Sequence, residues 1–73
     1  TTTIIKYSLP KNDFVKIRIY NTEGRVVLTI LNEYQNAGYY ELLADCTNLS
    51  SGVYFYKIET NNFNDIKKMV LVK

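Results

Sequence analysis

Alternation of apolar and polar residues is the feature that most limits how this chain can fold. Between residues 15 and 19 every second residue is a branched apolar one, and the residues between them are charged. The segment 3–9 repeats the pattern around Ile5 and Tyr7. A period of two places alternate side chains on opposite faces of a β-strand, whereas a helix needs a period near 3.6. We expect the inward rows to be Thr3, Ile5, Tyr7 and Leu9; Val15, Ile17 and Ile19; Tyr40, Leu42 and Ala44; and Tyr54, Tyr56 and Ile58.

Turn signals, mostly asparagine and glycine, separate these predicted strands. They recur at intervals of roughly 8–12 residues, which is typical of small all-β domains. Gly24 and Arg25 lie in the tightest turn, and Gly38 closes the longest break, which we place at 32–38. Apolar residues crowd both faces of 25–31, which predicts a bulge or burial on both sides.

A tyrosine after a glycine predicts the corner where the chain crosses from one sheet to the other. In the segment 49–58, Leu49 can fill the core end and Gly52 can let the chain turn sharply into a strand. Tyr54 can then give its hydroxyl to a backbone group upstream, as in the tyrosine corner of immunoglobulin-like sandwiches. We therefore predict that residues 1–73 form a single all-β domain, a small immunoglobulin- or fibronectin-III-like antiparallel sandwich of about seven strands.

The sequence offers little for catalysis. It has no histidine, and its one cysteine, Cys46, follows Asp45, a neighbour that would raise the pKa of the thiol rather than lower it. Asp45 and Asn48 favour turn capping over calcium binding. We therefore predict no enzyme activity, no metal site and no cofactor.

The charge balance and hydropathy limit the partners. Nine basic and seven acidic residues give a net charge of +2, too small to indicate nucleic acid or an anionic membrane. No apolar run approaches the length of a membrane span.

Five motifs occur in order along almost the whole chain. They read "TTTIIKYSLP", "VKIRIYNTEGRVV", "NAGYYELLAD", "LSSGVYFYKIET" and, at the end, "KKMVLVK". In order and spacing the chain resembles the C-terminal sorting domains of the bacterial type IX secretion system, which are related to the immunoglobulin-like module of the flagellar hook-capping protein. The matching positions are Tyr7, Leu9 and Pro10; Tyr20, Asn21, Gly24, Arg25 and Val27; Leu49, Gly52, Tyr54, Tyr56 and Ile58; and Lys67, Lys68, Met69, Val70, Leu71 and Lys73.

The resemblance implies that the domain is a sorting signal rather than an enzyme. The translocon would recognise this domain in the periplasm as an export tag. The cargo linked upstream would then be exported to the cell surface or the medium. In processed members a surface sorting protease removes the domain. The chain opens on Thr1, with no methionine and without the N-P-x-x-P lead of the family, which predicts a fragment of a longer exported protein.

The last strand admits two interpretations. In the first, the segment Lys67, Lys68, Met69, Val70, Leu71, Val72 and Lys73 carries the recognition information. A receptor would then pair with the strand by β-augmentation, with Val70 and Val72 in pockets and lysines at the rim. In the second, Ile66, Val70 and Val72 are core residues and the lysines protect a sheet edge.

Two other functions are compatible with the same fold. The domain can be a spacer or a surface filament subunit that self-associates through edge strands by strand exchange. A third interpretation, carbohydrate binding, requires exposed coplanar aromatic rings beside amides, for which Tyr20, Tyr34 and Tyr39 are the candidates.

Overall fold

The computed structural model describes residues 2–73 and places six β-strands there, so the expected count of about seven strands is wrong for this part of the chain. Residues 46–51, between β4 and β5, form turns and bends, as expected for a crossover. The strands are β1 (Thr2–Leu9), β2 (Asp13–Tyr20), β3 (Val26–Gln35), β4 (Gly38–Asp45), β5 (Gly52–Glu59) and β6 (Asn64–Leu71).

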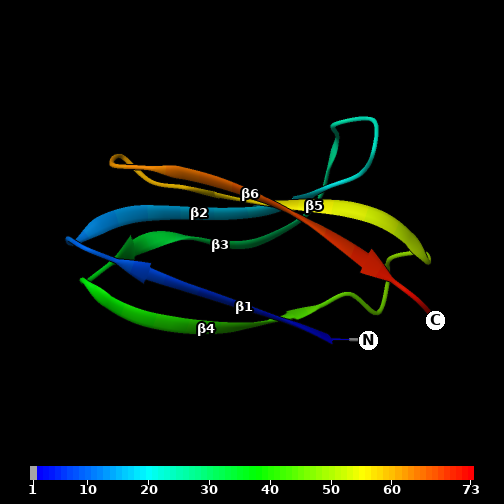
Figure 1. The fold of residues 1–73 in the computed structure, drawn as a ribbon, viewed down its shortest axis with the longest axis horizontal. Helices are drawn as coiled ribbons and strands as arrows, with labels where there is room; N and C mark the ends of the chain where they lie inside the picture. Colours follow the sequence, from blue (N-terminus) through cyan, green and yellow to red (C-terminus); the bar gives the residue numbers. More distant parts are fainter. Residues whose placement is uncertain (1) are drawn as a thin grey trace.

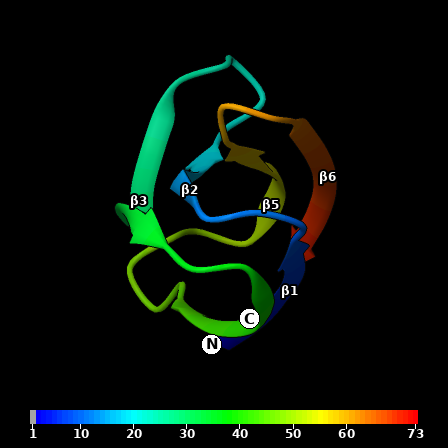
Figure 2. The same cartoon turned by 90° about the vertical axis from the view of Figure 1, so that its left-hand side faces the viewer.

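Two antiparallel sheets form the molecule. The smaller sheet pairs β1 with β4, and the larger one has the order β3-β2-β5-β6 (Figure 1). The second view shows β1 and β4 facing the inner side of the larger sheet, with β3 and β6 at its opposite edges (Figure 2). The prediction of an all-β antiparallel sandwich is confirmed.

The core lies between the sheets and is built from the alternate residues of each strand. The predicted rows of the first two strands are buried at Ile5, Tyr7, Leu9, Val15, Ile17 and Ile19. On β4, Ala44 is buried and Tyr40 and Leu42 pack against the core, while Tyr39, Glu41 and Leu43 are exposed. The period of two therefore predicted correctly which face of these strands is buried.

A polar contact joins the two sheets at one end of this core. The hydroxyl of Tyr7, on β1, donates a hydrogen bond to the side-chain oxygen of Gln35, at the end of β3. The ring of Tyr7 stacks on Tyr40 with the centroids 5.2 Å apart. A tyrosine hydroxyl is protonated at neutral pH and can donate to Gln35, and burial raises the pKa of Tyr7 further.

Strand β3 differs from its prediction in length. The register against β2 shifts at two points, between Ile17 and Arg18 and between Ile19 and Tyr20, which agrees with the predicted bulge. The strand then continues to Gln35, so the long break expected at 32–38 is wrong. It stays extended because it pairs with β2 through Asp13↔Gln35.

The turn from β2 to β3 is held by one side chain. The Oδ1 atom of Asn21 accepts hydrogen bonds from the backbone N–H groups of Glu23, at 2.9 Å, and Arg25, at 3.0 Å. Gly24 lies between them with φ of +82°, in the left-handed region that glycine enters without a steric cost.

The buried centre of β2 should be the most sensitive part of the fold. Ile17 is fully buried, so Ile17→Ala is expected to lower the free energy of unfolding by about 2–5 kcal/mol, through lost burial and the cavity left behind. Ile4→Ala is the matched control, because Ile4 is 55% exposed, and it should change stability by about 0.5 kcal/mol or less. Urea unfolding followed by circular dichroism measures both; equal losses would contradict this assignment of the core.

Candidate functional site

The last strand, β6, lies at one edge of the larger sheet. It pairs with β5 along its whole length, from Gly52↔Leu71 to Glu59↔Asn64. Its other edge has no strand partner among residues 2–73. β6 therefore presents a row of backbone N–H and C=O groups with which another chain can pair.

The two faces of β6 differ. Met69 and Leu71 point into the core and are 8% and 3% exposed. Ile66, Val70 and Val72 point away from it and are 60%, 59% and 82% exposed. The interpretation that these three are core residues is wrong. The four residues from Met69 to Val72 are all apolar, so the sequence alone lets either alternate pair face the core. The pairing of β6 with β5 selects the arrangement that buries Met69.

The lysines of the segment differ in their surroundings. Lys67 and Lys68 are exposed on opposite faces of β6. Lys73 fastens the end of the chain: its backbone N–H donates to Ser51 Oγ at 3.0 Å, and its ammonium group donates to the carbonyl oxygen of Thr47 at 2.6 Å. Both contacts tie the end of β6 to the crossover before β5.

A tyrosine fixes that crossover. The hydroxyl of Tyr54 donates to the carbonyl oxygen of Ser50 at 2.8 Å, and Leu49 packs against the core. Gly52 begins β5 with φ of +154°, which L side chains rarely adopt. Tyr54 is also the cross-strand partner of Met69, so the corner lies directly beside the C-terminal strand.

A buried carboxylate fixes the other end of β6. Asp13 is only 3% exposed and accepts hydrogen bonds from Phe14 N at 2.8 Å, Asn61 N at 3.2 Å and Asn62 Nδ2 at 2.7 Å. Asn61 and Asn62 form the turn between β5 and β6, so Asp13 anchors this hairpin to β2. Burial would raise the pKa of Asp13, but the hydrogen bonds, that from Asn62 first, hold the pKa below its usual range. The local sequence gives no signal for this anchor, because its partners Asn61 and Asn62 are 48 and 49 residues away.

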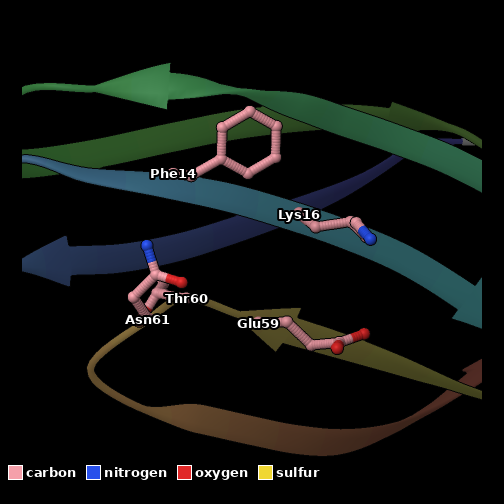
Figure 3. Close-up of a pocket in the computed structure, with 5 residues that line it drawn as sticks. All are labelled: Phe14, Lys16, Glu59, Thr60 and Asn61. Atoms are coloured by element: carbon pink, nitrogen blue, oxygen red, sulfur yellow. The ribbon is translucent and has the colours of Figure 1, made fainter.

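A shallow depression of about 170 Å³ lies on the outer side of the larger sheet. It is lined by Phe14, Lys16, Glu59, Thr60 and Asn61 (Figure 3). Glu59 is already paired with Arg18 at 2.5 Å, and a hydrogen bond from Arg18 lowers the pKa of Glu59. The depression therefore joins a paired carboxylate to one lysine and lacks a free general base.

The other candidate groups do not form a site. Cys46 is fully buried, and its thiol contacts the carbonyl oxygen of Ala44 at 3.6 Å. Within residues 2–73, no group of three or more potential metal ligands comes together. Tyr34 and Tyr39 are 63% and 93% exposed but belong to different sheets, and Tyr20 is half-buried, so the three do not form one row.

The family of the chain is known from its whole sequence. The family model of the secretion system C-terminal sorting domain matches residues 1–73, and the chain belongs to that family. No curated protein and no solved structure gave a significant match. The domain is a C-terminal sorting signal, through which the type IX secretion system exports the protein that carries it to the cell surface or beyond. The structure has no helix within residues 2–73 that is long and apolar enough to cross a membrane.

The tyrosine corner makes a testable contribution to stability. Tyr54→Phe removes the hydroxyl but keeps the ring, so the free energy of unfolding should fall by about 0.5–1.5 kcal/mol. Tyr39→Phe is the control, because Tyr39 is 93% exposed and should show no measurable change. Chemical denaturation compares the two; an unchanged Tyr54→Phe would mean that the hydrogen bond to Ser50 does not stabilise the corner.

The anchor at Asp13 predicts a pH dependence. A carboxyl group whose pKa is lowered by folding stabilises the fold at neutral pH, and this contribution is lost as the pH falls below about 4. Asp13→Asn should therefore have a lower thermal midpoint than the wild type at pH 7, and the difference should shrink towards pH 3. Asp13→Asn should still lose some stability at low pH. The reason is that hydrogen bonds from Thr47 and Arg18 lower the pKa values of Asp45 and Glu59. A difference that is constant with pH would contradict the anchor.

Proposed function

We propose that the segment 67–73, the last five residues of β6 and the two residues after it, is the part of this sorting domain that the export machinery recognises. The segment comprises Lys67, Lys68, Met69, Val70, Leu71, Val72 and Lys73. The observation that carries the proposal is the combination, in the part of the chain that the structure describes, of a strand edge without a strand partner and an exposed apolar row on the same strand.

An edge strand of this kind is unusual in a protein that has no partner. Natural proteins protect sheet edges with charges, proline, bulges or very short strands. β6 has eight residues and carries three exposed apolar side chains at Ile66, Val70 and Val72 in or next to it. A receptor strand added to this edge would take main-chain hydrogen bonds from β6 and place pockets over Val70 and Val72.

The two faces of the segment have different roles. Met69 and Leu71 hold the strand in the core, and Val70 and Val72 are available to the receptor. Lys68, between Ile66 and Val70 on the outward face, supplies positive charge at the rim. Lys73 keeps the end of the strand in place through Ser51 and Thr47.

The proposal also covers the wider export route. The domain, residues 1–73, acts without catalysis as one module of a longer polypeptide whose cargo lies upstream. It folds in the periplasm and is then delivered with the cargo to the outer surface or the medium. A surface sorting protease is the second partner in members that lose the domain there.

An export assay tests the proposal. Residues 1–73 are fused behind a signal peptide and a fluorescent protein and expressed in a bacterium with an active type IX system. The variant Ile66→Thr/Val70→Thr/Val72→Thr removes the outward row and leaves Met69 and Leu71 in the core. Most of the fluorescence should then stay in the periplasm, while the unchanged fusion reaches the surface or medium.

Two controls make the result specific. Ile4→Thr/Leu43→Thr removes a cross-strand apolar pair, 55% and 71% exposed, from the outer face of the smaller sheet and should be exported normally. Thermal unfolding of each purified domain establishes that the variants fold. Normal export of the folded β6 variant would refute a role for its outward row.

A further inference from the structure

The outer face of the larger sheet carries a continuous apolar surface that reaches far beyond β6. We call it the outer apolar band: Val26, Tyr20, Phe55, Val53, Val70 and Val72. The band crosses all four strands of the larger sheet, from β3 at one edge to β6 at the other. Figure 2 shows these two strands on opposite sides of β2 and β5.

The strand registers show that the band is continuous. Tyr20 lies directly opposite Val26 on β3 and opposite Phe55 on β5. Val53 lies two residues from Phe55 on the same face and opposite Val70. Residues directly opposite in antiparallel strands have their side chains on the same face and in contact range.

This surface lies outside the sandwich core. The smaller sheet covers the inner side of the larger one, where Ile17, Ile19 and Met69 are buried. On the outer side, the ends of the band are exposed: Val26 by 45%, Val70 by 59% and Val72 by 82%. Tyr20, Val53 and Phe55 between them are half-buried, and the Arg18 guanidinium lies over the Tyr20 ring, 5.5 Å from its centroid. Contiguous exposed apolar surface on a small soluble domain marks an interaction site.

The charges around the band are mostly positive. Lys68 lies opposite Phe55, and Lys57 lies two residues from Phe55 on the same face. Glu59, two residues beyond Lys57 on this face, pairs with Arg18 at 2.5 Å and lies 3.9 Å from Lys57, so the three groups together keep a net positive charge. Two copies packed through this face would bring together two surfaces of net positive charge, so the charge favours an acidic partner over self-association.

We propose that the outer apolar band docks face-on against a protein of the export machinery whose surface has an apolar centre and acidic side chains at its rim. This inference rests on the proposed reading of β6 and extends it: contact runs across β5 and β2 to β3, rather than stopping at the strand edge. Recognition then depends on the folded four-stranded sheet, because only folding brings Val26 into line with Val70.

Val26 gives the sharpest test, because it is in the band but two strands away from β6. Val26→Glu and Val26→Lys remove the same apolar side chain and introduce opposite charges at a position that is 45% exposed. Against an acidic partner, Val26→Glu should reduce export in the fluorescent fusion assay by roughly tenfold or more. Val26→Lys should stay within roughly threefold of the unchanged fusion, because its charge is attracted to the same rim.

The outcomes separate this inference from the proposed function. Suppose that Val26→Glu and Val26→Lys are exported to the same extent while the triple β6 variant stays in the periplasm. The face-on contact is then refuted, and the proposed recognition of β6 stands. If neither Val26→Glu nor the β6 variant changes export, both are refuted. Sedimentation velocity on the purified domains gives the remaining check: a concentration-dependent dimer that Val26→Glu abolishes would assign the band to self-association and overturn the inference.

Discussion

The pairing of β6 with β5 is the interaction on which the rest of the structure depends. It determines that Met69 and Leu71 enter the core and that Val70 and Val72 face outward. A domain of this size buries only about 60% of the surface that its unfolded chain exposes, so the inward pair matters to the fold. The same strand therefore stabilises the domain with one face and presents its signal with the other.

Both ends of that strand are fixed by polar groups that lie elsewhere in the sequence. Asp13 holds the turn before β6, and Lys73 joins the end of the chain to the crossover that Tyr54 stabilises. These contacts keep the outward row in one geometry before any partner arrives. A pre-ordered strand loses less conformational entropy on binding, which favours recognition of the folded domain.

The sequence predicted the strands whose two faces differ in composition. The alternation around Ile17 allows one phase only, and the glycine before Tyr54 predicted the corner position. The prediction from sequence failed where the apolar–polar alternation is lost. The four apolar residues from Met69 to Val72 fit either face of the strand, and pairing with β5 determines which face is buried. The prediction also failed at Gln35, where a polar segment stays extended because it pairs with β2, and Gln35 accepts a hydrogen bond from Tyr7, a residue distant in the sequence. The anchor at Asp13 was missed for the same reason, because Asn61 and Asn62 approach it only in the folded chain.

The central claim is that the export machinery meets β6 as a folded strand and contacts one of its faces. Site-specific photo-cross-linking in cells tests this most directly, with a photoreactive residue placed in turn at positions 68, 69, 70, 71 and 72 of a fusion stalled during export. The account predicts cross-links to the translocon from 68, 70 and 72 and few or none from 69 and 71. Equal cross-linking from all five positions would show that the strand is read unfolded, and would contradict the account.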